Sequence, residues 1–252
     1  MRSVPVRAAS LLLCWPALAL TGCAPQHADH LPAYIWTNNQ AALRELSRHA
    51  HAVKTMSAAA LLTLTRPDGQ SIRLDGAVVI SLADRKVRLR AWKLGQAVFD
   101  LTLTREALWI EIPKDSAHRR QIGPASISAS QFARGLSIFD GDEFDGLAVR
   151  LIDQGGPTLE VRKLLEDGQT ISVEVEHSTL IVRQYRLSDA RGAVHFTLTP
   201  TDYRPFNGIL WPTRLKAKSD SGAIDAELRD VEINGDLPPS AFVPPRGAEK
   251  AS

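Results

Sequence analysis

The sequence predicts an α+β protein that is mostly antiparallel sheet. We expect an incomplete, half-open barrel of about 10–11 strands with an N-terminal helix and a mid-chain lid helix. Runs with a period of two recur between short polar turns from residue 55 to residue 234, as an antiparallel meander requires. Only two segments have helical spacing, and both are too short to cover the apolar face of so many strands. The sheet is therefore expected to curl around them.

The first 23 residues have the form of a secretory signal that ends at a cysteine. Two arginines precede Ala8–Leu20, a run of thirteen mostly apolar residues, whereas a membrane-spanning helix needs about 20. The following Leu20-Thr21-Gly22-Cys23 resembles the lipobox of bacterial lipoproteins. This resemblance implies attachment of a diacylglycerol to Cys23, cleavage before it and acylation of the new amino terminus. The alternative is an ordinary secretory signal with a chance cysteine.

These features divide the chain into four parts. They are a lipoprotein signal peptide (1–22), a lipid anchor and tether (23–36), a half-barrel domain (37–245) and a disordered tail (246–252). Ala24 follows the cysteine where an aspartate would favour the inner membrane. By analogy with lipoprotein sorting in enteric bacteria, we expect an outer-membrane lipoprotein that faces the periplasm.

The charge and cysteine content argue against a nucleic-acid-binding protein and against a domain stabilised by disulfides. Two of the 30 basic residues lie in the signal, which leaves 28 basic against 28 acidic residues and gives no basis for nucleic-acid binding. Cys14 leaves with the signal, and lipid is expected to block Cys23. The folded body then has no disulfide, so its core must stabilise it alone.

The first half of the domain begins with a helix over residues 38–53. Thr37 and Gln40 resemble a capping box, and apolar residues recur at helical spacing after them. Five strand candidates follow, separated by polar turns such as Pro67-Asp68-Gly69. They are residues 59–65, 72–82, 87–92, 97–103 and 108–112.

The second half begins with a polar loop and a short helix. Residues 126–139 form this predicted lid helix, with Phe132, Leu136 and Phe139 along one side. Residues 203–208 are predicted to be a loop. The strand candidates are residues 147–152, 158–164, 170–176, 180–187, 193–198, 214–218 and 223–234.

The sequence contains no motif for catalysis, a cofactor or a metal. It has no glycine-rich phosphate loop, no G-x-S-x-G and no paired histidines at metal-binding spacing. Asp75, Asp100 and Glu111 lie on strand candidates, where acids more often pair with arginines across the sheet. We therefore expect a protein that is not an enzyme and has no cofactor and no metal.

The order of these elements resembles the LolA/LolB-like family of bacterial lipoprotein-sorting carriers and receptors. The residues 107–113 (ALWIEIP) look like the strand before that family's mid-chain helices. Residues 208–212 (GILWP), 230–234 (DVEIN) and 237–242 (LPPSAF) look like its C-terminal strands and closing turn. The resemblance implies an apolar cavity under a helical lid that receives acyl chains of lipids or lipoproteins.

A lipid-anchored member of this family resembles the receptor, LolB, more than the soluble carrier. The receptor exposes an apolar residue at the tip of an early hairpin. In this sequence the first hairpin tip is Arg66-Pro67-Asp68-Gly69, which has no large apolar residue. This departure leaves open a divergent relative that serves another lipid or a protein partner.

The leading hypothesis is an envelope lipoprotein that binds or transfers an acyl-chain ligand, a lipid or a lipoprotein. Strand alternation does not separate a cavity wall from a filled core. The alternative is a non-catalytic assembly or scaffold lipoprotein that binds an envelope protein, with Trp92 and Trp109 as contacts. The candidate ligand-binding residues are Val78, Ile80, Leu89, Phe99, Leu101, Ile110, Phe132, Leu136, Val173, Phe196 and Leu228.

Overall fold

The computed structural model describes residues 33–105, 107–112, 135, 136, 139, 141, 144–146, 148–153, 155–246 and 248–251 of the chain. Thirteen strands in these ranges form one sheet in which every neighbouring pair is antiparallel. The strands are β1 (Thr55–Thr65), β2 (Ser71–Ser81), β3 (Lys86–Lys93), β4 (Gln96–Leu103), β5 (Leu108–Glu111), β6 (Val149–Asp153), β7 (Thr158–Leu164), β8 (Thr170–Glu176), β9 (Val182–Ser188), β10 (Val194–Phe206), β11 (Ile209–Ser219), β12 (Gly222–Ile233) and β13 (Glu249–Ala251).

The sheet consists of two meanders joined in the middle. Its order is β13-β5-β4-β3-β2-β1-β12-β11-β10-β9-β8-β7-β6. β1 pairs with β12 in a register that places Leu62 opposite Ala226, which links the start of the domain to its end. The outermost strands, β13 and β6, do not pair with each other, so the sheet stays open. The predicted half-open antiparallel architecture is confirmed at this level, with thirteen strands rather than about 10–11.

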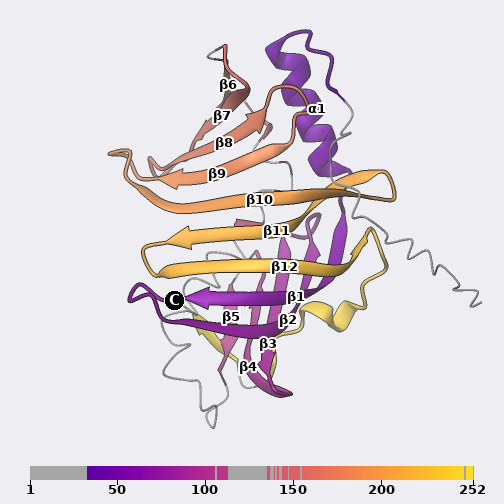
Figure 1. Cartoon of the computed structure of the whole chain (residues 1–252), viewed down its shortest axis with the longest axis vertical. Coiled ribbons are helices and arrows are strands. Elements are labelled where there is room, and N and C mark those ends of the chain that lie inside the picture. The colour runs from indigo at the N-terminus through magenta and orange to yellow at the C-terminus, as the bar shows by residue number, and fades with distance from the viewer. Residues whose placement is uncertain are drawn as a thin grey trace, which may run out of the picture.

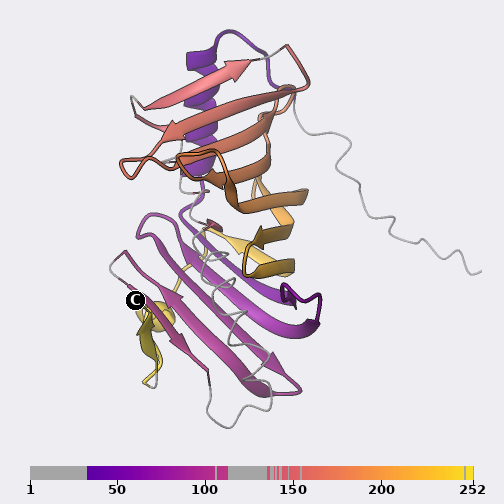
Figure 2. The same cartoon turned by 90° about the vertical axis from the view of Figure 1, so that its left-hand side faces the viewer.

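The α-helix α1 (Asn39–His51) lies across the upper strands β6–β9 (Figures 1 and 2). Its N-cap is Asn38, whose side-chain oxygen accepts a hydrogen bond from the backbone N–H of Ala41 at 2.9 Å. The predicted capping box at Thr37 is therefore one residue too early. Ala42 and Leu46 are buried, as the helical spacing predicts.

The second meander contains a longer hairpin than the sequence pattern indicates. β10 and β11 are paired as far as Phe206 and Ile209, across the region predicted to be a loop. Asn207 and Gly208 form the turn with φ values of 50° and 79°. Two residues with positive φ give the type I′ turn that matches the twist of antiparallel strands. Because the turn lies at residues 207 and 208, Pro205 belongs to β10 and Pro212 belongs to β11.

The C-terminal region also differs from the sequence prediction. Residues 246–252 are predicted to be a disordered tail, but Glu249–Ala251 form β13, which pairs with β5 along the edge of the sheet. A free strand edge offers unpaired N–H and C=O groups, and pairing with β13 satisfies those of β5. The single helical turn predicted at residues 238–242 is present as the 3-10 turn η3 (Pro239–Phe242).

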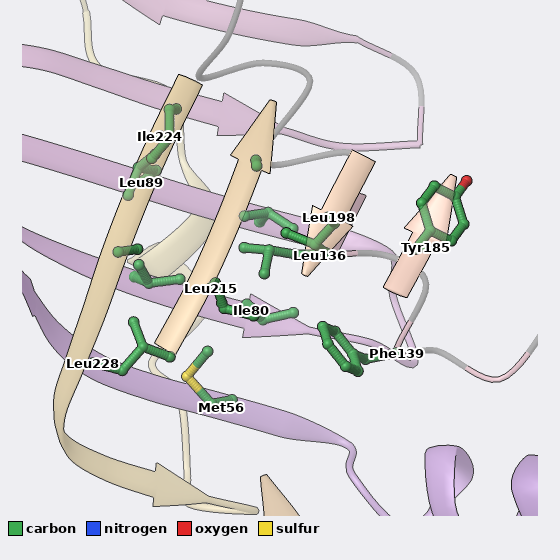
Figure 3. Packing of buried hydrophobic residues seen from close by; sticks show 14 of the residues in the cluster. Met56, Ile80, Leu89, Leu136, Phe139, Tyr185, Leu198, Leu215, Ile224 and Leu228 are labelled. Atoms are coloured by element: carbon green, nitrogen blue, oxygen red, sulfur yellow. The ribbon is translucent and has the colours of Figure 1, made fainter. Parts of the chain in front are cut away.

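The buried side chains of both meanders form one continuous hydrophobic cluster. Figure 3 shows Leu136 beside Leu198 of β10, within this cluster. Gly135 approaches β10 so closely that a Cβ there would lie 2.6 Å from Cζ of Phe196. Residues 135 and 136 therefore pack against the sheet. Of the predicted lid helix 126–139, only Gly135, Leu136 and Phe139 are among the described residues.

Candidate ligand pocket

A pocket of about 440 Å³ lies between α1, the β8–β9 turn and the tip of the β10–β11 hairpin. We call it the α1 pocket. Small-molecule sites typically enclose about 300–1,000 Å³. Its lining residues are Ala33, Tyr34, Glu45, Leu46, Arg48, His49, Ala50, Ala52, Val53, Phe139, Phe144, Thr179, Leu180, Ile181, Val182, Tyr203, Gly208, Ile209, Leu210, Trp211 and Pro212.

The inner wall of the α1 pocket is apolar. Leu46 and Val53 contribute from α1 and its C-terminal end, and Leu180 contributes from the β8–β9 turn. Trp211 of β11 lies against Phe139, with ring centroids 4.8 Å apart and the planes tilted by 48°. Trp211 is only 2% exposed, so its ring forms a fixed part of the wall. These side chains favour hydrocarbon over a polar ligand.

Tyr203 fastens the hairpin side of the pocket to β9. Its hydroxyl donates a hydrogen bond to the carbonyl oxygen of Val182 at 2.8 Å. Burial raises the pKa of the Tyr203 hydroxyl far above its usual value, so that the hydroxyl stays protonated and remains a donor. The bond holds two lining segments together. It also uses the tyrosine's only proton, which leaves that proton unavailable to a ligand.

The polar rim of the pocket is a three-residue cluster on α1. Arg48 Nε donates to Glu45 Oε2 at 2.9 Å, and His49 Nε2 lies 2.9 Å from Glu45 Oε1. The hydrogen bond from Arg48 lowers the pKa of Glu45, which is therefore ionised at neutral pH. Burial lowers the pKa of His49, so its ring is mostly neutral at pH 7. The cluster has no net charge and offers little to a free carboxylate.

The segment that leads into α1 lies at the mouth of the pocket. The Tyr34 N–H donates to the carbonyl oxygen of Ser178 at 2.7 Å. The ring of Trp36 stacks on His177 with centroids 4.7 Å apart. These contacts hold the last residues of the predicted tether against the β8–β9 turn, and Ala33 and Tyr34 become part of the lining.

The ligand-binding residues predicted from the sequence lie elsewhere. None of the described ones lines the α1 pocket. Ile110 is partly buried against the core, and Phe132 lies outside the described residues. Their role in holding a ligand stays a prediction. The buried members are Val78, Ile80, Leu89, Phe99, Leu101, Leu136, Val173, Phe196 and Leu228.

The pocket residues could have been found from two signals in the sequence. Leu46 and Ala50 lie on the predicted apolar stripe of the first helix. Trp211 lies in residues 208–212, one of the stretches that carry the family resemblance. The sequence pattern does not show that these two segments lie close together. Their proximity depends on how far the β10–β11 hairpin extends.

A second, smaller pocket of about 240 Å³ lies near the β3–β4 hairpin, and Trp92 and Phe99 line part of it. Leu94 at the tip of this hairpin is 93% exposed. Its φ is 51°, in the left-handed region, and Gly95 follows with a φ of 79°. The tip of the β3–β4 hairpin thus exposes a large apolar residue, whereas the Arg66–Gly69 turn has none. Trp109, the other candidate contact, is half-buried.

The described residues contain no cluster of three or more His, Cys, Asp or Glu side chains able to hold a metal ion. Among these residues, no helix has the length and apolar character needed to cross a membrane. Asp100 pairs with Arg88 through two hydrogen bonds of 2.9 and 2.8 Å. It thus makes the cross-strand ion pair expected for acids on this sheet, and it is not among the residues that line the α1 pocket.

Comparison with solved structures identifies the fold. A LolA superfamily protein from Nitrosomonas europaea has a TM-score of 0.55 and 14% identity, over 82% of this chain and 98% of that one. A domain assigned to outer membrane lipoprotein sorting, from Vibrio parahaemolyticus, has a TM-score of 0.56 and 11% identity, over 81% and 95%. The chain has the LolA-superfamily fold.

A DUF1329 family protein from Desulfovibrio piger is similar to the same extent. Its TM-score is 0.57 at 10% identity, over 81% of this chain and 96% of that one. No protein-family model matches the sequence, and no curated protein matches it either. The predicted resemblance is thus confirmed for the fold. A LolA-like sheet does not by itself specify the ligand, which must be argued from the pocket.

Proposed function

We propose that this protein is a bacterial envelope lipoprotein that binds an acyl-chain ligand in the α1 pocket and passes it on without chemical change. The ligand is the hydrocarbon chain of a lipid or of another lipoprotein. Lipidated Cys23 anchors the protein to the outer membrane, with its folded domain in the periplasm. The lipobox-like sequence and the fold shared with a lipoprotein-sorting domain support this placement.

One observation carries the proposal: the α1 pocket has an apolar wall, and the polar side chains of its rim bind one another, whereas the buried indole N–H of Trp211 has no partner among the described residues. Glu45, Arg48 and His49 form a closed cluster, and the Tyr203 hydroxyl is used by Val182. A hydrocarbon chain can enter without breaking any of these bonds. It gains roughly 0.8 kcal/mol for each CH₂ group that leaves water.

The exposed Leu94 supports a role at a membrane. The left-handed conformation of a leucine raises the free energy of the folded state by about 1–2 kcal/mol. Burial of the Leu94 side chain does not offset this cost, because the side chain is exposed. Lys93 precedes it, and a cation beside an apolar tip suits the boundary between anionic headgroups and acyl chains. We assign to this hairpin the contact with the bilayer during ligand transfer.

The proposed activity is binding rather than catalysis. Glu45 and His49 are titratable groups of the lining: the hydrogen bond from Arg48 lowers the pKa of Glu45, and burial lowers the pKa of His49. The described lining residues include no serine or cysteine, and the hydroxyl of the lining Thr179 donates a hydrogen bond to Glu176. This set of side chains suits the capture of an apolar chain.

The test uses the Cys23→Ser chain, which cannot carry the lipid, and a fluorescent fatty-acyl ester as probe. We expect saturable binding of one probe per chain. Ile209→Trp places a larger ring in the pocket and should weaken binding at least tenfold. Leu164→Trp is the matched control, since Leu164 is exposed and lies outside the pocket, and it should bind normally. Equal binding by all three chains would refute the proposal.

A further inference from the structure

The described chain begins inside the α1 pocket. Ala33 and Tyr34 are lining residues, and the hydrogen bond from Tyr34 to Ser178 fixes them there. The stacking of Trp36 on His177 fixes the next turn of chain. Ala33, the first described residue, therefore lies at the mouth of this pocket.

Cys23 stands ten residues before Ala33. Ten residues span at most about 33–36 Å when fully extended. A group attached to Cys23 can thus reach the bilayer on which the domain rests, and it can equally fold back into the mouth of the α1 pocket. The tether permits both positions.

The chemistry of the pocket suits the group that Cys23 is expected to carry. Acyl chains on a lipoprotein are joined through ester and amide links and end in no free carboxylate. The rim of the pocket has no net charge, because Glu45 pairs with both Arg48 and His49. An uncharged linkage can lie beside this cluster, and its hydrocarbon can lie on Leu46 and Trp211.

We propose that the α1 pocket is the resting place of an acyl chain carried by Cys23 of the same molecule. The inference rests on the proposed function, because it assigns an occupant to the same site. The tether sets the effective concentration of this chain near the millimolar range of short flexible linkers. A foreign acyl chain must compete with it, so the pocket is free only when the anchor inserts fully into the membrane.

This arrangement makes the anchor a regulator of loading. In the membrane-inserted state, the chain from Cys23 lies in the bilayer and the pocket accepts ligand. After the anchor leaves the bilayer, its own chain occupies the α1 pocket and excludes another apolar molecule from it. The α1 pocket thus binds a foreign acyl chain in the first state and the chain from Cys23 in the second.

The test is photocrosslinking of the full lipoprotein. Cells are grown with a fatty acid that carries a diazirine, so that the lipid on Cys23 becomes reactive to light. In detergent-extracted protein we expect adducts on peptides that contain Leu46 to Val53 or Ile209 to Trp211. Mixing ¹⁵N-labelled and unlabelled protein separates adducts within one chain from adducts between chains.

A longer tether provides the control. Inserting twenty Gly/Ser residues after Pro32 triples the distance in sequence from Cys23 to Ala33, and the intramolecular yield should fall about fivefold, because effective concentration decreases with roughly the −3/2 power of linker length. Adducts found only outside the α1 pocket, or only between chains, would overturn the inference.

A parallel experiment separates this inference from the proposed function. The Cys23→Ser chain is mixed with the methyl ester of the same diazirine fatty acid. If the methyl ester labels the α1 pocket but the lipid on Cys23 gives no adduct there, the proposed function is supported and only the inference of self-occupation is rejected. Failure of both experiments rejects the acyl pocket as well.

Discussion

At the scale of single residues, Glu45 sets the charge of the pocket rim, and under the proposed function this charge governs whether an anionic or an uncharged acyl group binds. It is bound by Arg48 and His49, and these contacts cancel the charge of the rim. The Arg48 side chain is 64% exposed, so its pairing with Glu45 is worth only about 0.2–1 kcal/mol. The pair therefore acts on selectivity more than on stability.

Glu45→Gln should convert this neutral rim into a cationic one. Arg48 would then be free to meet a carboxylate, and a fatty-acid anion should bind about two- to fivefold more tightly at low salt. The methyl ester of the same acid should bind as it does to the unchanged protein. Competition against the fluorescent probe measures both, and a parallel change for acid and ester would contradict the assignment.

His195 provides a pH-dependent contact outside the pocket. Its ring lies between Asp220, at 3.2 Å, and Asp189, at 3.4 Å, and joins the β9–β10 and β11–β12 turns. Hydrogen bonds to Asp220 and Asp189 raise the pKa of His195. A raised folded-state pKa means stabilisation that is complete below the unfolded value near 6.5 and is lost as pH rises through the folded value.

The variant His195→Gln tests this sign. Its melting temperature should lie below that of the unchanged protein at pH 5.5, and the gap should close by pH 9, where the histidine is neutral in both states. Thermal unfolding across this range gives the comparison. A gap that widens as pH rises would show that the charged ring does not stabilise these turns.

At the scale of elements, the sequence predicts what depends on local pattern. The period of two places β2, β3 and β8 within a residue or two, and helical spacing places α1. The loop predicted at residues 203–208 is wrong for residues 203–206, which belong to β10, because the turn of this hairpin consists of Asn207-Gly208 alone. That pair is a strong hairpin signal, and it extends β10 and β11 toward α1.

β13 was not predictable from its own residues. Glu249–Ala251 contain no alternating apolar pattern, and only the free edge of β5 gives them a strand conformation. The α1 pocket was not predictable from local pattern either. It forms where the end of one hairpin meets a helix more than 150 residues away in sequence. Strand alternation instead directed the ligand prediction to core residues such as Leu89 and Leu101.

The turn at Asn207-Gly208 should be sensitive to one added methyl group. Gly208 has a φ of 79°, with open space around the position of a Cβ, so Gly208→Ala changes only backbone strain. We expect the free energy of unfolding to fall by about 1–2 kcal/mol. Gly156→Ala is the matched control, because Gly156 is equally open and lacks a positive φ. Chemical denaturation of both variants tests the difference, and equal losses would contradict it.

At the scale of the whole molecule, the pairing of β1 with β12 makes one open sheet of two meanders. Each side of this junction has a distinct feature: the α1 pocket lies beside the second meander, and the exposed Leu94 lies at a hairpin tip of the first. Figure 2 shows the two meanders turned relative to each other. The proposed function therefore assigns acyl-chain binding to one meander and membrane contact to the other.

The most direct measurement is a crystal structure of the Cys23→Ser chain soaked with an acyl ester that is brominated at its terminal carbon. Our account predicts an anomalous bromine peak between α1 and the β10–β11 hairpin, against Leu46 and Trp211. A bromine peak among Val78, Leu89 and Leu101 instead, or full occupancy by ester on the outside of the sheet with an empty α1 pocket, would contradict it.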